Sequence, residues 1–256
     1  MFFKGFFLES PSWEERSLVI VSTRTMRLDR MLANAGVGTR QEVKKLIRKG
    51  LVMVNDAIVT LADTSIDLDT DRVFVGDQEI VYEEYVYVLL HKPEGYLSAT
   101  EDRHDKTVME LIEGYEHRDL HIVGRLDKDT TGFLLLTDDG QFTHHLTSPK
   151  HHIGKRYRVT LTTPFEPNDL EKITKPIAMD GELTLPSEAK ILEDNVVLLT
   201  IYEGKHHQVK RMFERLGYEV TQLHREAIGA IELGSLPKGQ FRPLTKDEVK
   251  KLKNVS

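Results

Sequence analysis

Two short helical patterns come first in the ordered part of the sequence. Apolar residues recur three and four positions apart over residues 28–35, which is the spacing of one helix face. A second stripe of this kind follows over residues 39–50, where Thr39 and Glu42 form a capping box. Strand-like alternation then begins and is interrupted by a turn at Asn55-Asp56. The expected strands are short and include residues 51–54, 58 and 73–75.

From residue 85 the pattern changes to longer apolar runs. Residues 85–90 are apolar almost without interruption, as in a strand buried on both faces. We therefore place a domain boundary at residues 82–85. Strands and helices then mix without regular alternation, which predicts the α+β fold class. The expected strands are 121–126, 132–137, 156–163, 189–192 and 196–202, and the expected helices are 107–113, 141–147, 167–174 and 208–216.

The composition agrees with two modest domains that each bury a core. The chain has 256 residues, of which 39% are hydrophobic and 30% charged, so disordered and low-complexity architectures are excluded. No run approaches the roughly 18 apolar residues of a membrane span. The sequence contains no cysteine, which excludes disulfides, iron–sulfur clusters and thiol nucleophiles. These features predict a soluble, cytoplasmic protein.

The net charge of −6 conceals a strongly polarised chain. Residues 24–60 carry eight basic and three acidic side chains, whereas residues 61–85 carry one basic and eight acidic. Within the predicted second helix, Arg40, Lys44 and Arg48 recur every four residues and share one face. Such a face is either simply solvated or contacts an RNA backbone, and the scarcity of acids on it favours RNA.

The densest polar segment is residues 124–132, which lies between two apolar strand patterns. Asp127 or Asp129 could form an ordinary Asx-turn there, or one of them could be a catalytic carboxylate held by a rigid scaffold. No phosphate-binding loop or dinucleotide fingerprint is present, and the adjacent histidine pairs lack metal-ligand spacing. We therefore expect neither a cofactor nor a metal. The acid-free cations Lys150, Lys155, Arg156 and Arg158 suggest an edge that contacts RNA.

These segments resemble two known families. Residues 26–80 resemble the S4 RNA-binding module, through Arg27-Leu28-Asp29-Arg30-Met31-Leu32, Thr39-Arg40 and Lys49-Gly50-Leu51-Val52-Met53-Val54-Asn55. The rest resembles the pseudouridine synthases of the RsuA group. The motifs that carry this resemblance are Lys92-Pro93-Glu94-Gly95-Tyr96, Gly124-Arg125-Leu126-Asp127 with Thr130-Thr131-Gly132, Ser148-Pro149-Lys150-His151-His152 with Lys155-Arg156-Tyr157, His206-His207-Gln208-Val209-Lys210, and Leu223-His224-Arg225-Glu226-Ala227-Ile228-Gly229.

The resemblance implies a domain organisation. Residues 1–25 would be an extension of unknown status, residues 26–84 an S4-like RNA-binding domain, and residues 85–256 a catalytic domain with a mixed, mainly antiparallel sheet. The His206-His207-Gln208-Val209-Lys210 motif is most similar to the enzymes that modify 16S rRNA. The expected partner is therefore 16S rRNA within an assembling small ribosomal subunit. We expect a monomer, because the sequence shows no obvious spare apolar face.

The resemblance also assigns roles to individual residues. Asp127 would be the catalytic carboxylate, with Asp129 in a supporting role. Tyr157 would cover the uracil, although an ordinary strand tyrosine is the alternative. Lys210 would keep Asp127 ionised, although it could instead pair with Glu214. The expected substrate and RNA contacts are Arg125, which would fill the place of the flipped base, Val209 below the uracil, Arg211 as the alternative to Lys210, and Arg27, Arg40, Lys44 and Arg48 in the S4 module.

Three other functions compete with pseudouridine synthesis in 16S rRNA. A non-catalytic ribosome-assembly factor would have no chemical reason to retain Asp127, Arg125, Tyr157 and Lys210 together. A synthase acting on large-subunit rRNA would usually carry arginines in the His206-His207-Gln208-Val209-Lys210 motif. A small-nucleoside hydrolase would need a second carboxylate to activate water and would have no use for the basic helix.

Overall fold

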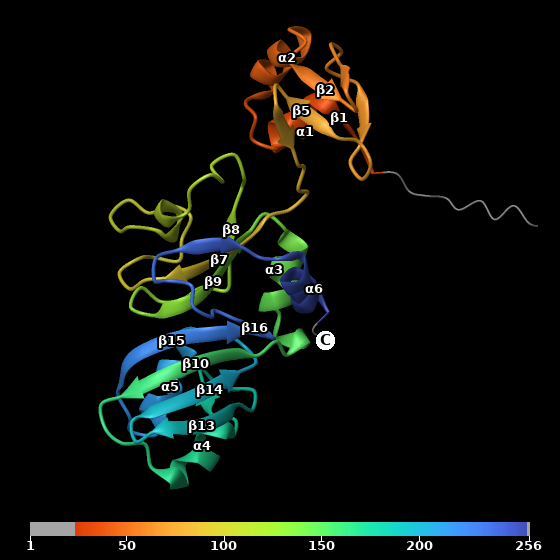
Figure 1. Cartoon of the computed structure of the whole chain (residues 1–256). Helices are drawn as coiled ribbons and strands as arrows, with labels where there is room; N and C mark the ends of the chain where they lie inside the picture. The colour runs from red at the N-terminus through yellow and green to blue at the C-terminus, as the bar shows by residue number, and fades with distance from the viewer. Residues whose placement is uncertain (1–23, 255–256) are drawn as a thin grey trace, which may run out of the picture. The chain divides into compact units, whose positions relative to one another are not determined.

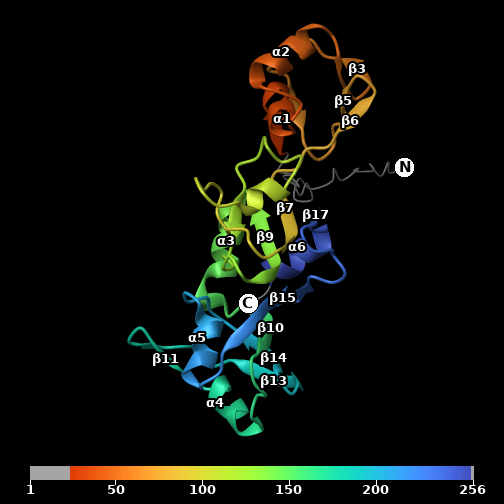
Figure 2. The same ribbon diagram turned by 90° about the vertical axis from the view of Figure 1, so that its left-hand side faces the viewer.

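The computed structural model describes residues 24–254, which divide into two compact units (Figures 1 and 2). The first unit extends to Tyr82 and the second begins at Glu83. The predicted extension at residues 1–25 lies almost wholly outside the described residues. No helix in the described part of the chain is long and apolar enough to cross a membrane.

The first unit combines two helices with small sheets. Its core contains Leu28, Leu32, Val43 and Ile47 from the helices and Val52 from the first strand of the larger sheet. The helices are α1 (Leu28–Asn34) and α2 (Arg40–Arg48). The four-stranded sheet has the order β3-β2-β5-β6, with β2 Val52–Val54, β3 Ala57–Ile58, β5 Val73–Val75 and β6 Gln78–Ile80, while β1 (Thr25–Arg27) pairs with β4 (Ser65–Asp67).

Local sequence signals in this unit act as predicted. The Thr39 hydroxyl accepts a hydrogen bond from the Glu42 N–H, and the Glu42 carboxylate accepts one from the Thr39 N–H at 2.8 Å. Asn55 and Asp56 have φ values of 50° and 65°, the left-handed conformation that a tight hairpin turn requires. The predicted helices and hairpin are therefore confirmed.

A nine-stranded mixed sheet forms the second unit. The order is β13-β14-β10-β15-β9-β7-β17, with β8 on β9 and β16 on β15, and only the β15–β9 pair is parallel. This confirms the predicted mixed, mainly antiparallel sheet. The strands are β7 Tyr87–Lys92, β8 His121–Val123, β9 Thr131–Thr137, β10 Lys155–Leu161, β13 Glu188–Glu193, β14 Val196–Ile201, β15 Val220–Ile228, β16 Ile231–Glu232 and β17 Phe241–Pro243.

The strands β15 and β8 both pair with the same edge of β9, and this arrangement positions the site. β15 pairs with Thr131 and Gly132 at the beginning of β9, whereas β8 pairs with residues 135–137 at its end. The loop of residues 124–130 connects β8 to β9 and emerges where the edge changes partner. A loop held between diverging strands can present side chains to a cavity without losing its rigid support.

Helices cover both faces of this sheet. Met212 and Phe213 of α5 (Gln208–Arg215) pack on the face that includes Leu134, and Phe142 of α3 (Gly140–Thr147) packs on the opposite face. The helix α4 (Leu170–Thr174) belongs to the first face and α6 (Lys246–Lys253) to the second. A separate hairpin, β11 (Ala178–Met179) with β12 (Glu182–Leu183), projects near α5 (Figure 2).

Some predicted elements differ from the structure. The predicted helix at 107–113 is the four-residue 3₁₀-helix η2 (Val108–Leu111), although its capping box is present. The predicted helix at 167–174 begins as the 3₁₀-helix η4 (Pro167–Asp169) before α4, because Pro167 favours a tight first turn. A third 3₁₀-helix, η3 (Pro149–His151), as well as β15 and α6, was not predicted.

An ion pair joins the helix α6 to β17 and makes part of the stability of the fold depend on pH. Glu248 accepts two hydrogen bonds from Arg242, at 2.7 and 2.8 Å. The Arg242 guanidinium lowers the pKa of Glu248 to about 2, against the opposing effect of burial and with help from the Thr245 N–H. We expect Glu248→Gln to lower the free energy of unfolding by about 2 kcal/mol at pH 7.

Because the folded pKa lies below the ordinary value of 4.5, this contribution is present above pH 4.5 and is lost as the pH falls towards 2. Urea unfolding of both proteins at several pH values measures the difference. Asp247→Asn in the same helical turn is the matched control and should change stability by less than about 0.5 kcal/mol. A wild-type advantage that stayed constant down to pH 2 would contradict the assignment.

Candidate functional site

The loop of residues 124–130 is held by hydrogen bonds from several segments. The Thr130 N–H donates to the Asp127 carbonyl at 3.1 Å, which closes a turn directly after the carboxylate. The Gly95 N–H donates to the Lys128 carbonyl at 2.8 Å. The Ser98 hydroxyl donates to the Leu126 carbonyl at 2.7 Å and accepts from the Leu126 N–H. The turn at 92–96 therefore acts as a scaffold for the loop.

Lys92 supports the same loop from beneath. Its fully buried ammonium donates to the carbonyls of Pro93, Lys128 and Thr130, at 3.1, 3.2 and 2.8 Å. Burial lowers the pKa of Lys92 to about 8, while the negative charges of Asp129 and Asp127 oppose this shift. Sequence reasoning did not select Lys92, because a lysine at the end of a strand is normally expected in solvent.

Asp127 lies among positive and ionisable groups from helix α5. Its side chain is 30% exposed, with Lys210 Nζ 3.6 Å from Oδ2 and His207 Nε2 3.4 Å from Oδ1. Asp127 is thus accessible to a substrate and has a cation beside it. A partly exposed carboxylate with a neighbouring cation is suited to act as a nucleophile or a base.

Lys210 contacts both carboxylates of the loop but is hydrogen bonded to Asp129. Its Nζ lies 2.6 and 2.7 Å from the two carboxylate oxygens of Asp129. Burial alone would raise the pKa of Asp129, but the hydrogen bond and the charge of Lys210 lower it below its ordinary value. Lys210 therefore joins α5 to the loop through Asp129, and its alternative predicted partner, Glu214, forms no ion pair with it in the described residues.

A buried polar turn sets the start of α5. The Glu203 carboxylate is buried and accepts hydrogen bonds from the Leu185 N–H and from Gln208 Nε2, both at 2.9 Å. The following turn brings His207 into the left-handed conformation, with φ 49°, and stacks its ring on that of His206 at 3.8 Å. His207 therefore faces Asp127. This histidine pair belongs to a motif of the resembled family, but the sequence predicts no contact between His207 and Asp127.

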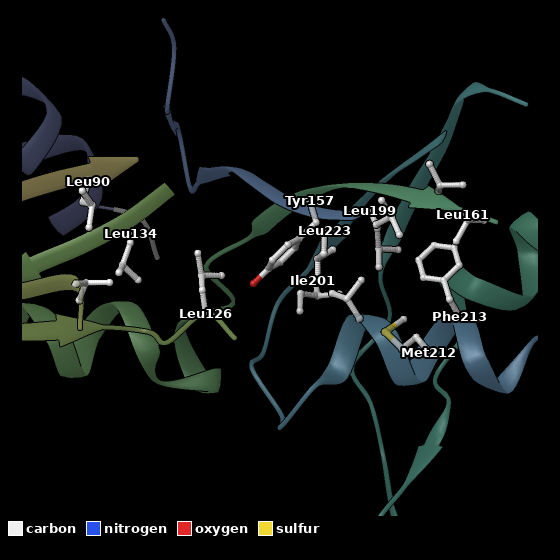
Figure 3. Packing of buried hydrophobic residues seen from close by; sticks show 14 of the residues in the cluster. Leu90, Leu126, Leu134, Tyr157, Leu161, Leu199, Ile201, Met212, Phe213 and Leu223 are labelled. Carbon is white, nitrogen blue, oxygen red and sulfur yellow. The ribbon is translucent and has the colours of Figure 1, made fainter. Parts of the chain in front are cut away.

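A cavity of about 530 Å³ opens beside Asp127. Tyr157 lines it and is only 7% exposed, and Val209 of α5 is 4% exposed in the same lining. Figure 3 shows the Tyr157 ring between Leu126 on one side and Ile201 and Leu223 on the other. The cavity thus has an aromatic face and an apolar wall next to the carboxylate, which is a suitable environment for a nucleobase.

Arg225 lines this cavity and holds Tyr157. It is 1% exposed and donates to the carbonyls of Phe133 and Gly124, at 2.8 and 3.0 Å, and to the Tyr157 hydroxyl at 3.4 Å. The Leu223–Gly229 motif contains this residue, but an arginine in an apolar strand would ordinarily be placed in solvent. The structure brings it instead to the centre of the site.

Two of the predicted arginines occupy different surroundings. Arg125 is exposed, lines the cavity and has no hydrogen-bond or ion-pair partner among residues 24–254. Arg211 is bound by Asp180 through two hydrogen bonds, at 2.7 and 2.9 Å, so it fastens the β11–β12 hairpin to α5. Arg211 is therefore not adjacent to Asp127, and Lys210 is the α5 cation that approaches it.

The basic face of the first unit contains two kinds of cation. Arg27 and Lys44 both contact the buried Asp29, at 3.0 and 3.7 Å, so part of their charge is compensated within the fold. Arg40 and Arg48 are exposed on α2 and form no ion pair with any residue of the described chain. The free positive charge of this helix face is therefore concentrated at its two ends.

The cations of the RNA-contacting edge expected at residues 150–158 have different surroundings. Arg156 pairs with Glu232 at 2.5 Å and Arg158 with Glu226 at 2.7 Å, while Lys155 is buried. Strand geometry explains the difference, because alternate residues of β10 face the cavity and the opposite side of the sheet. No group of three metal-ligating side chains occurs within the part of the chain that the structure describes.

Two family models match this chain. One, described as an S4 domain, matches residues 26–69 and thus the first unit. The other, described as an RNA pseudouridylate synthase, matches residues 86–215. The second match includes the loop of residues 124–130, Tyr157 and the helix α5.

Relatives and a solved structure extend the similarity to both units. The ribosomal small subunit pseudouridine synthase A of Vibrio cholerae is 43% identical over 227 residues, 88% of this chain and 98% of that protein. The protein of the same name from Escherichia coli is 39% identical over 227 residues, 88% of this chain and 98% of that protein. A crystal structure of a pseudouridylate synthase is 42% identical, has a TM-score of 0.63 and covers 89% of this chain and 99% of its own.

Proposed function

The chain belongs to the RNA pseudouridylate synthase family, within its group of ribosomal small-subunit synthases, and we propose that it isomerises one uridine of 16S rRNA. The resemblance of the His206-His207-Gln208-Val209-Lys210 motif to the 16S rRNA enzymes supports a target of the uridine-516 type. The observation that carries the proposal is the position of Asp127 at the edge of a cavity with an aromatic face. The protein is proposed to act as a cytoplasmic monomer on rRNA in an assembling small subunit.

Asp127 is proposed as the catalytic carboxylate. Isomerisation breaks the bond between N1 of uracil and C1′ of ribose and joins C5 to C1′, with no redox change and no group transferred from elsewhere. The reaction needs an ionised carboxylate at the ribose, to attack C1′ or to take the C2′ proton, and both routes use the same residue. Lys210 and His207 place positive or polar groups beside that carboxylate.

The remaining residues are proposed to hold the flipped base. A uridine must leave its stack to enter the cavity, which costs a few kcal/mol unless it already lies in a loop. The Tyr157 ring would cover the uracil, and Val209 would lie below it. Arg125 is proposed to occupy the vacated position in the RNA, because it is exposed at the cavity and its planar guanidinium can stack and bind phosphate.

Tritium release tests the reaction directly. The purified protein is incubated with a 16S rRNA transcript, or a partly assembled 30S particle, that carries tritium at C5 of uridine. C5 loses its hydrogen only when it becomes the glycosidic carbon, so one tritium per RNA should be released. Binding of both RNAs without any release would overturn the proposed activity and favour a non-catalytic assembly factor.

The S4 unit is proposed to dock the enzyme on rRNA through Arg40 and Arg48. We expect the double variant Arg40→Gln/Arg48→Gln to make the slope of log affinity against log salt shallower by about 1 to 2. Each phosphate contact contributes roughly 0.7 to 0.9 to the steepness of this slope. Filter binding at several salt concentrations measures the slope. Arg72→Gln is the matched control, because Arg72 is held by Glu79. An unchanged slope in the double variant would exclude this docking face.

A further inference from the structure

The wall of the cavity contains buried positive charge that no carboxylate neutralises. Lys155 and Arg225 line the cavity and are 7% and 1% exposed, while Lys92, beneath the adjoining loop of residues 124–130, is 0% exposed. Among residues 24–254, no carboxylate oxygen lies within 4.0 Å of the nitrogens of these three side chains. An unpaired buried charge destabilises a fold, so two such cations in the lining of one cavity indicate a role that involves negative charge on the ligand.

Lys155 differs from the other two in its hydrogen bonds. Lys92 donates to three carbonyl groups, and Arg225 donates from all three of its guanidinium nitrogens. Lys155 has three N–H groups but, within the described chain, makes a single long hydrogen bond of 3.4 Å to the Ile153 carbonyl. Lys155 also lines the cavity, so two of its three N–H groups are left for a ligand there.

The position of Lys155 relative to Tyr157 suggests what that ligand atom is. Both residues belong to β10, two positions apart, and therefore lie on the same face of the sheet. Both line the same cavity. If the Tyr157 ring covers the uracil, an ammonium at the neighbouring position on that face is placed to meet the edge of the base, where its carbonyl oxygens are found.

We propose that Lys155 hydrogen bonds a carbonyl oxygen of the flipped uracil and stabilises the negative charge that the base carries after the N1–C1′ bond breaks. This role rests on the proposed synthase function. The electron pair of the broken bond leaves with the uracil and spreads over N1 and the carbonyl oxygens. C5 then bonds to C1′ and loses its proton, N1 gains a proton, and the product is an isomer of the substrate.

The electrostatic surroundings fit this role. Burial, followed by the charge of Arg225, lowers the pKa of Lys155 to about 8, while Glu203 opposes the shift. The ammonium form therefore still predominates at pH 7. A cation in a site that excludes water interacts with developing charge far more strongly than one in solvent. The gain is larger for the separated uracil anion than for neutral uridine, so it accelerates the reaction instead of tightening binding.

Single-turnover kinetics with two bases test the assignment. Lys155→Met removes the charge and keeps an unbranched apolar chain in the buried space, and Lys155→Arg keeps the charge. The RNA carries uridine or 5-fluorouridine at the target position, and consumption of that nucleoside is followed by chromatography after digestion. Lys190→Met is the matched control, because Lys190 is an exposed lysine on β13 of the same sheet and does not line the cavity.

The two bases separate a chemical role from a structural one. Fluorine withdraws electrons and stabilises the uracil anion, so a 5-fluorinated base needs less help from Lys155. We expect Lys155→Met to slow uridine consumption about 100-fold or more, with RNA affinity within about threefold of the wild type. The loss should be at least tenfold smaller with 5-fluorouridine. Lys155→Arg should retain most of the activity, and Lys190→Met should behave as the wild type.

Each contrary outcome has a distinct meaning. Equal losses on both bases, or a loss confined to RNA affinity, would overturn the role of Lys155 while leaving the proposed function intact. Wild-type protein that consumes neither base would overturn the proposed function, and this assignment with it. If Lys155→Met does not fold, as judged by its thermal melt, Lys155→Gln places a neutral amide in the same space and gives the same comparison.

Discussion

Asp127→Asn should abolish tritium release from C5-labelled 16S rRNA while leaving RNA binding intact. Asparagine has nearly the same shape as aspartate, but its amide can neither attack C1′ nor accept the C2′ proton. We expect the single-turnover rate to fall roughly 10⁴-fold or more, the scale on which enzymes lose rate when their central nucleophile or base is removed. Quantifying tritium released per RNA over time measures this loss.

The structure explains why this variant should keep its fold. Lys210 is held by two short hydrogen bonds to Asp129, so α5 remains joined to the loop when the charge of Asp127 is removed. The loop backbone is fixed by Lys92 and Ser98, whose partners are main-chain carbonyls. Neither set of contacts uses the Asp127 carboxylate.

Asp129→Asn is the matched control for this loss. The substitution removes a carboxylate two residues away in the same loop, and it breaks the ion pair with Lys210 instead of the proposed reacting group. We expect it to reduce the rate by about tenfold or less, because Lys210 can still approach Asp127 from 3.6 Å. If Asp129→Asn abolished tritium release and Asp127→Asn retained it, the two roles would be reversed.

Local signals in the sequence were sufficient for much of the fold. The Thr39–Glu42 capping box and the Asn55-Asp56 turn each specify backbone geometry within a few residues, and both occur as predicted. The Thr245–Glu248 capping box carries the same signal, and it begins α6. That helix could therefore have been predicted, because the information needed is contained in four adjacent residues.

Buried cations limited the prediction of the site. Arg225 and Lys155 lie on core-facing positions of strands, where periodicity assigns apolar side chains. The rule that charged residues are exposed therefore predicts that both side chains face solvent, which is wrong. It also hides the strand pattern of β15. Only the three-dimensional contacts with the Phe133, Gly124 and Ile153 carbonyls account for their positions.

The sequence could not predict the contact between Lys210 and Asp129, for a different reason. The two residues are 81 positions apart, and carboxylate oxygens of both Asp129 and Asp127 lie near the same ammonium, at 2.6 and 3.6 Å. The motif places Lys210 near the loop, but the choice between two carboxylates depends on the geometry of α5. That geometry is set by the turn at Glu203 and Gln208, whose hydrogen bonds form only in the folded chain.

Gly132→Ala should strongly destabilise the second unit. A Cβ atom at this position would lie 2.2 Å from the Arg225 carbonyl oxygen and 2.8 Å from its backbone nitrogen. Both are backbone atoms of the parallel β15–β9 pair and cannot move aside singly. The φ of 110° is also one that residues with a side chain rarely adopt. We expect a loss of about 4 kcal/mol or more in the free energy of unfolding.

The substitution should also disrupt the site, because the backbone atoms that the new Cβ would clash with belong to Arg225. Separating β15 from β9 would displace the guanidinium that holds the Gly124 carbonyl and the Tyr157 hydroxyl in the cavity lining. Urea unfolding measures the loss, with Gly140→Ala as the matched control, since a Cβ there meets no atom within 4 Å. If Gly132→Ala kept wild-type stability, β15 and β9 would be able to separate at this point. The placement of Asp127 would then not depend on a fixed pairing of β15 and β8 with the same edge of β9.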